Sequence, residues 1–215
     1  MTMGDDRSSM IDDRSSPPSP SKARLGCPRR GTPRSRALAG RILGLFGWRM
    51  LGTLPDVPRF VLIVAPHTSN WDFPLGIFAM FTVGLQLTWL GKHTLFRFPV
   101  RGLLRWLGGE PVDRAAPLGV VGAAIERFRD RPQWVLAIAP EGTRRRISQW
   151  KTGYHRVAHG AGVPILPVAI DYSRRVIEIG TLFEPTDDAR ADTAALRRRF
   201  TTAMARYPEQ FATEP

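Results

Sequence analysis

The sequence of 215 residues is poor in cysteine, lysine and acidic residues. Cys27 is its only cysteine, so an intramolecular disulfide is impossible and a disulfide-stapled secreted domain is excluded. Only three of the 31 basic residues are lysines, and 19 acidic residues leave a formal net charge of +12. Such a positive field attracts polyanions, among them nucleic acid, anionic lipid headgroups and phosphorylated substrates.

The chain also lacks an internal repeat and the apolar run of a secretory signal peptide. Aspartates within residues 5–13 interrupt the region where that run would lie, which disfavours export by this route. One uncharged stretch, residues 73–91, approaches the length of a membrane-spanning helix. Because Pro74 stands at its start and Gly84 and Gln86 interrupt its second half, we predict a helix followed by a strand instead.

The first 54 residues divide into two segments. Residues 1–36 are rich in Ser, Pro, Gly, Arg and Asp and cannot bury enough apolar surface to offset the entropy of ordering, so we predict a disordered basic tail. Residues 37–54 are apolar but carry Arg41 and Arg49 near one helical face, which predicts an amphipathic helix. Two placements of this helix stay open: packed on the domain, or lying in a membrane interface with its arginines on anionic headgroups.

Residues 55–215 alternate short β-rich runs with helical patterns. This alternation predicts a single α/β domain around a mainly parallel or mixed central sheet flanked by helices. Apolar and periodic runs give the elements. Strands are predicted at 60–65, 87–90, 134–139, 165–171 and 176–179, and helices after Pro99 and at 118–128, 154–161 and 193–207.

The first polar motif, HTSNWD, runs from His67 to Asp72 and directly follows the strand run FVLIVA and Pro66. A histidine at the carboxyl end of a strand can meet an aspartate of the next helical turn, whose carboxylate then accepts the imidazole Nδ1–H. That contact fixes the tautomer and leaves Nε2 as a general base. Spacing alone also fits a polar loop histidine and an unrelated residue at the helix start.

A second motif, PEGTR over residues 140–144, follows the strand run WVLAIA. Glycine permits close backbone approach, threonine supplies a hydroxyl, and arginine supplies a planar fork suited to phosphate. A third segment, GGEPVDR, lies between the two motifs and ends at Arg114. Taken alone, each of these segments is equally compatible with a surface turn that carries solvated arginines.

Together with VPILPV at residues 163–168, these motifs occur in the order and rough spacing of the glycerolipid acyltransferases, and residues 60–171 resemble that family, which includes the 1-acyl-glycerol-3-phosphate acyltransferases. The resemblance implies transfer of a fatty acyl group from acyl-CoA or acyl-carrier protein to a hydroxyl of a lysophospholipid or glycerol phosphate. It implies His67 as general base and Asp72 as its orienting partner. It further implies that acceptor-binding residues are Lys92, Arg114, Glu141, Gly142, Thr143 and Arg144.

The chemistry of acyl transfer agrees with this assignment. A neutral hydroxyl is a poor nucleophile, so a positioned base must take its proton as the oxygen attacks the thioester carbonyl. We expect no covalent acyl-enzyme, and no cofactor besides the acyl-CoA or acyl-carrier protein substrate. No metal site is expected either, because the histidines are scattered and His155 and His159 are predicted to lie at the surface.

The expected partners are an acyl thioester donor, a lysolipid or glycerol phosphate acceptor and an anionic membrane surface, with the protein peripheral on the cytoplasmic, inner face. Nucleic acid is not expected, because the basic tail has no aromatic residue to stack on bases. Two other functions stay open. The same dyad activates water in an acyl thioester hydrolase, which needs no phosphate-binding arginines. A non-catalytic protein binds anionic lipid through its arginines and keeps that function without His67.

Overall fold

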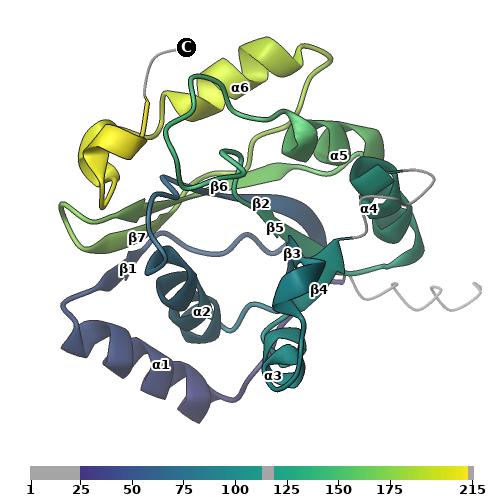
Figure 1. The fold of residues 1–215 in the computed structure, drawn as a ribbon. Helices are drawn as coiled ribbons and strands as arrows, with labels where there is room; N and C mark the ends of the chain where they lie inside the picture. The colour runs from purple at the N-terminus through teal and green to yellow at the C-terminus, as the bar shows by residue number, and fades with distance from the viewer. Residues whose placement is uncertain (1–24, 113–118, 213–215) are drawn as a thin grey trace, which may run out of the picture.

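The computed structural model describes residues 25–112 and 119–212, which form one α/β body (Figure 1). Most of the predicted tail, residues 1–24, and the predicted site residue Arg114 lie outside the described residues. The described part contains a single sheet with helices on both faces. This arrangement confirms the predicted fold class.

Seven strands form the sheet in the order β1-β7-β6-β2-β5-β3-β4. β6 and β7 pair antiparallel and all other neighbours pair parallel, so the sheet is mixed, with five strands running one way. The strands are β1 Arg49–Leu51, β2 Arg59–Ala65, β3 Thr88–Lys92, β4 Gly109–Val112, β5 Trp134–Ile138, β6 Ile165–Asp171 and β7 Val176–Ile179.

Helices α1 and α2 cover one face of the sheet, and α4, α5 and α6 cover the other (Figure 1). The short α3 lies beside β4. The helices are α1 Pro33–Leu45, α2 Asp72–Val83, α3 Arg101–Trp106, α4 Gly119–Asp130, α5 Gly153–Ala161 and α6 Ala189–Arg197, and short 3-10 turns are His93–Leu95, Thr202–Met204 and Pro208–Gln210.

The central strand β2 divides the core into two clusters. Because successive side chains of a strand point to opposite faces, Val61 and Ile63 pack toward α4 and α5, whereas Phe60 and Leu62 pack toward α1 and α2. All of these side chains are buried, as expected for a parallel strand covered on both faces. β2 therefore has a fixed register, and its carboxyl end at Ala65 is held at one edge of the sheet.

The N-terminal helix differs from the prediction at both ends. It begins at Pro33, where Thr32 and Ser35 form a capping box, so residues 33–36 are helical. Cys27 is buried and Arg29 forms a β-bridge with Leu85, so the predicted disorder does not extend over residues 25–36. It ends at Leu45, and residues 49–51 instead form β1 beside β7. The single helix predicted over 37–54 is wrong, because Gly47 adopts a positive φ and the following residues find a strand partner more than a hundred residues away.

The uncharged stretch 73–91 folds as a helix and a strand, as predicted. α2 ends where Gly84 takes a φ of 64°, and β3 begins at Thr88. Among residues 25–112 and 119–212, no helix combines the length and the apolar character needed to cross a membrane. The last predicted helix, 193–207, is misplaced: α6 starts at Ala189, where Asp188 caps the helix, and ends at Arg197.

Candidate active site

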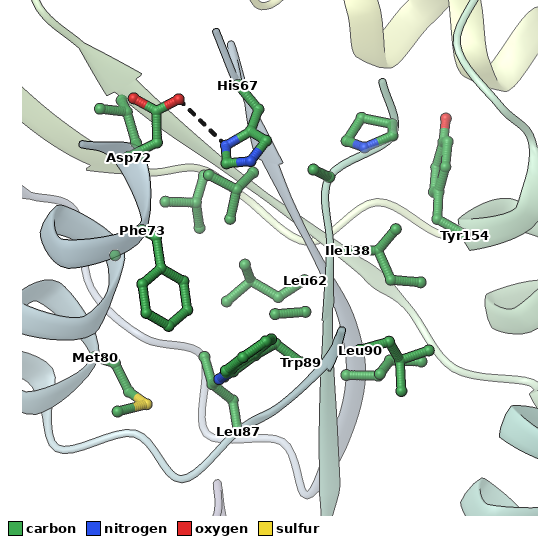
Figure 2. Close-up of a pocket in the computed structure, with 18 of the residues that line it drawn as sticks. Leu62, His67, Asp72, Phe73, Met80, Leu87, Trp89, Leu90, Ile138 and Tyr154 are labelled. Atoms are coloured by element: carbon green, nitrogen blue, oxygen red, sulfur yellow. Dashed lines mark ion pairs between the residues drawn. The ribbon is translucent and has the colours of Figure 1, made fainter. Parts of the chain in front are cut away.

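His67 and Asp72 lie side by side where the chain leaves β2 and enters α2 (Figure 2). His67 Nδ1 is 3.2 Å from Asp72 Oδ2. The imidazole is about one fifth exposed and lines a pocket, whereas the carboxylate is almost fully buried. The residue spacing therefore does bring the two side chains together across a turn, with Nδ1 turned toward the carboxylate and Nε2 as the remaining ring nitrogen.

The Asp72 carboxylate has a donor for each of its oxygens. Oδ2 accepts the Ser69 backbone N–H at 2.8 Å in addition to its contact with His67, and Oδ1 accepts the Tyr172 hydroxyl at 2.6 Å. Burial of a carboxylate is costly unless such partners are present. These contacts fix the plane of the carboxylate and, through it, the orientation of the histidine ring.

The PEGTR motif reaches the same edge because β5 is the direct parallel neighbour of β2. Its turn is closed by a hydrogen bond of 3.0 Å from the Gly142 N–H to the Ala139 carbonyl. Gly142 has a φ of 63°, a conformation that is strained for a residue with a side chain. The positive φ explains why this motif has a glycine at position 142. Gly142 is exposed, so a ligand can approach the backbone of the turn.

Glu141 occupies a different place from the one that the resemblance implies. Its side chain is 1% exposed, and Oε1 accepts the His67 backbone N–H at 2.7 Å. Burial raises the pKa of Glu141 to about 7, although the hydrogen bond from His67 acts in the opposite direction. Glu141 therefore connects the PEGTR turn to the HTSNWD loop and does not line the pocket. The next three residues of the motif, Gly142, Thr143 and Arg144, do line it.

Two exposed cations, Arg144 and Lys151, line the pocket together with His67. Arg144 donates from Nε to the Ser69 carbonyl at 3.2 Å. Lys151 lies across Gly142, because a Cβ added to that glycine would come within 3.2 Å of Lys151 Nζ. Lys92, which the family resemblance implies as an acceptor-binding residue, is exposed at the end of β3 and lies outside the pocket lining.

The pocket below the dyad is deep and apolar, with a volume of about 730 Å³ (Figure 2). That volume falls in the usual range for small-molecule sites. α2 forms one wall with Phe73, Gly76 and Met80, and the sheet forms another with Leu62 and Trp89. An apolar cavity of this kind favours a hydrocarbon chain, because each buried methylene contributes about 0.8 kcal/mol.

Sheet geometry explains why the pocket exists. β3 and β5 pair through only two residue pairs, Thr88 with Leu136 and Trp89 with Ala137. The pairing of β3 with β5 ends at Trp89 and Ala137. The cavity is lined by side chains from the core clusters on both faces of the sheet. Figure 2 shows this arrangement, with Phe73 and Met80 on the α2 side and Leu90, Ile138 and Tyr154 on the other.

The histidines of α5 do not both lie at the surface as predicted. His155 is 3% exposed, and its Nε2 lies 2.8 Å from Asp192 Oδ2 on α6. His159 is partly exposed and pairs with Asp187 at 3.0 Å. The prediction for His155 is wrong because its acidic partner comes from a separate helix, which spacing in the sequence does not reveal.

The structure combines an α/β domain, a His–Asp dyad and an apolar pocket that is also lined by two cations, which is the arrangement of an enzyme that acts on a lipid-like, anionic substrate. A family model described as Acyltransferase matches residues 54–171, more than half of the chain. The chain belongs to this acyltransferase family.

Several proteins similar in sequence are named as 1-acyl-sn-glycerol-3-phosphate acyltransferases. The 1-acyl-sn-glycerol-3-phosphate acyltransferases of Salmonella typhimurium and Escherichia coli are each 29% identical over 153 residues, which is 66% of this chain and 61% of the relative. A probable 1-acyl-sn-glycerol-3-phosphate acyltransferase of Mycoplasma pneumoniae is 35% identical over 124 residues, 54% of this chain and 46% of that protein. The chain thus spans about three fifths of the length of the first two relatives.

A solved structure shares the fold. The 1-acyl-sn-glycerophosphate (LPA) acyltransferase PlsC from Thermotoga maritima aligns with a TM-score of 0.56 and 20% sequence identity. The alignment covers 77% of this chain and 76% of that chain. The mixed sheet and its helical layers are therefore a known architecture.

Proposed function

We propose that the protein transfers a fatty acyl group from an acyl thioester to the free hydroxyl of a 1-acyl-glycerol-3-phosphate-type acceptor. The observation that carries this proposal is the His67–Asp72 pair at the mouth of a deep apolar pocket, flanked by Arg144 and Lys151. A base, a hydrocarbon site and a phosphate site are the three elements that such a reaction needs. The printed names of the relatives support the same substrate class.

His67 acts as the general base. Nε2 removes the hydroxyl proton as the acceptor oxygen attacks the thioester carbonyl, and Asp72 stabilises the imidazolium through Nδ1–H. A C–O bond forms, the C–S bond breaks, and the imidazolium returns the proton to the departing thiolate. The products are an ester and a free thiol, so the reaction balances without a further cofactor and without an acyl-enzyme.

Arg144 and Lys151 hold the acceptor phosphate. Arg144 Nε is already engaged with the HTSNWD loop, which places its guanidinium next to the base. A phosphate bound between the Arg144 guanidinium and the Lys151 ammonium fixes the acceptor hydroxyl near His67. This positioning accelerates the reaction because the hydroxyl is already held close to the base. Gly142 and Thr143 line the same site. Phosphate contacts by Lys92 and Arg114 stay predictions.

A membrane surface delivers the acceptor. Exposed apolar side chains lie on α1 and directly after it, on α3, and in the segment before α3. The helices α1 and α3 lie on the same side of the molecule (Figure 1). Phe98 is 95% exposed, and arginines alternate with the apolar residues. This composition suits an anionic bilayer surface. The apolar residues are Leu38, Leu45, Phe46, Phe98, Leu103 and Trp106, and the exposed arginines are Arg34, Arg41, Arg97, Arg101 and Arg105.

The proposal is tested by supplying labelled long-chain acyl-CoA or acyl-carrier protein to the purified chain on anionic liposomes. The acceptor is 1-acyl-glycerol-3-phosphate, another lysolipid, glycerol phosphate or none. A labelled lipid that forms only with a phosphate-bearing glycerolipid supports the proposal and identifies the donor. Release of free fatty acid without any dependence on acceptor contradicts it and establishes a thioester hydrolase.

A further inference from the structure

The catalytic carboxylate is bound by a residue just beyond the segment that matches the family. The match ends at residue 171, and Tyr172 follows directly after β6. Its hydroxyl donates to Asp72 Oδ1 at 2.6 Å, across a separation of 100 residues. We infer that Tyr172 is a positioning residue for the proposed acyltransferase dyad. Its hydroxyl orients Asp72, and Asp72 in turn orients His67.

Tyr172 reaches Asp72 because of the sheet order. β6 is the parallel neighbour of β2 on the side away from β5, so its carboxyl end lies at the same edge as the HTSNWD loop. The carboxyl end of β5 supplies Glu141 behind His67, and the end of β6 supplies Tyr172 beside Asp72. The dyad is therefore held from both neighbouring strands.

Tyr172 is itself held from three directions. Its ring packs edge-on against Trp48 with the centroids 5.0 Å apart, and its backbone N–H donates to the Met204 carbonyl at 2.9 Å. The Arg206 guanidinium lies 5.7 Å from the centre of the ring. A phenol fixed in this way cannot swing away from Asp72 without losing several contacts.

The hydroxyl completes the hydrogen bonding of a buried carboxylate. Oδ2 binds the histidine and the Ser69 N–H, and Oδ1 binds Tyr172. Burial and the neighbouring Asp72 raise the pKa of Tyr172, so the hydroxyl stays protonated and donating over the working pH range. Without this donor, Oδ1 is left unsatisfied in a buried site, and the carboxylate is free to tilt around the contacts of Oδ2.

The residues that follow β7 and α6 support the same arrangement. The Tyr207 backbone N–H donates to Thr68 Oγ1 at 3.3 Å, inside the HTSNWD loop. Arg206 lies over the rings of Trp71 and Tyr207 as well as that of Tyr172. The backbone of residues 204–207 is therefore hydrogen-bonded both to Tyr172 and to the HTSNWD loop, and the Tyr207 hydroxyl takes no part in these contacts.

The test compares Tyr172→Phe with the parent chain in acyl transfer. The phenyl ring keeps its packing on Trp48, so only the hydroxyl is lost. We expect kcat to fall about tenfold, since a hydrogen bond to a charged group is removed, with the KM of donor and acceptor within about twofold. Tyr207→Phe is the matched control: it leaves the backbone contact to Thr68 and the ring beside Arg206 in place, and should leave kcat unchanged.

The pH profile separates a role in the dyad from a general loosening of the fold. Removing the donor leaves more negative charge on Asp72, which favours the imidazolium over the neutral ring, so the acidic limb of kcat/KM should move to higher pH. The other charged groups around the dyad are Glu141 from the β5 turn, Arg144 and Lys151 in the pocket lining, and Arg206, which contacts the Tyr172 side chain. The substitution changes none of these side chains, so the shift is assigned to the lost Tyr172 hydroxyl.

Two further measurements make the inference refutable. In an Asp72→Asn background, Tyr172→Phe should have no additional effect on kcat, because the two residues act in series. The NMR resonances of the His67 ring, recorded without any substrate, should differ between Tyr172→Phe and the parent chain. Unchanged His67 ring resonances, or a full tenfold loss that persists in the Asp72→Asn background, overturn the inference. An absence of acyl transfer by the parent chain contradicts the proposed function alone, since the NMR comparison still decides the role of Tyr172.

Discussion

Gly76 gives the sharpest test of how an acyl chain lies in the pocket. It stands on α2 one turn after Asp72, lines the pocket, and has no heavy atom within 4 Å of the position of an added Cβ. A larger side chain at this position therefore projects into the cavity rather than into its wall. Gly76→Leu should shorten the longest acyl chain that the enzyme accepts.

The size of the effect follows from the volume that the new side chain takes. Leucine occupies the space of roughly three to four methylenes, and each buried methylene contributes about 0.8 kcal/mol. A chain that fills the pocket of the parent protein thus loses about 2 to 3 kcal/mol of binding, or about 30- to 150-fold in kcat/KM. Shorter chains should be unaffected, because they do not reach the obstructed part.

The same substitution should not destabilise the fold. Glycine within a helix costs up to about 1 kcal/mol relative to alanine, so replacing Gly76 should raise the melting temperature slightly. Gly76→Ala is the control, because it gains the helix propensity while filling little of the pocket. A further control is Gly102→Leu in α3, another helical glycine with no atom near an added Cβ and outside the pocket lining.

The assay measures kcat/KM for a series of acyl donors of increasing length with each variant. The reasoning requires that Gly76→Leu reduce the rate with long donors only, while Gly76→Ala and Gly102→Leu keep the parent preference. If Gly76→Leu leaves the preference unchanged, or lowers the rate equally for every length, then the acyl chain does not run along α2.

Glu141→Gln should flatten the pH dependence of stability. Burial raises the pKa of Glu141 from 4.5 to about 7, so the parent chain loses up to roughly 3 kcal/mol of unfolding free energy as pH rises through this window. Denaturant titrations of both proteins at pH 5 and pH 8 measure this loss. Arg144→Ala should lower kcat/KM for the acceptor about 10- to 100-fold and leave donor binding nearly unchanged; a loss confined to donor binding contradicts the phosphate role. Phe98→Asp should weaken sedimentation with anionic liposomes while turnover of a dispersed short-chain acceptor persists, and unaltered sedimentation excludes Phe98 from the membrane contact.

Local patterns predicted those parts of the fold that depend on nearby residues. The strands at 165–171 and 176–179 have the predicted bounds, because continuous apolar runs are characteristic of buried strands. His67 and Asp72 meet because a strand end, a short turn and a helix start bring them together within six residues. The two motifs share an edge because both follow parallel strands.

The parts that failed depend on contacts distant in sequence. Residues 49–51 were predicted to be helical because their strand partner, β7, lies far away in the sequence. His155 was predicted to lie at the surface because its partner Asp192 is on a separate helix. Tyr172 carried one usable signal, its position directly after a strand of the same sheet, but only the strand order β6-β2 shows that it faces Asp72.

The proposed acyl transfer depends on the His67–Asp72 dyad as its base. The most direct measurement is the rate of labelled lipid formation from 1-acyl-glycerol-3-phosphate and a long-chain acyl thioester, with His67→Ala compared with the parent chain. A base that contributes about 100- to 10,000-fold predicts a loss of that size in kcat, with the variant still folded and still bound to liposomes. Equal rates in the two proteins would contradict the proposed mechanism, because acyl transfer would then proceed without His67 as its base.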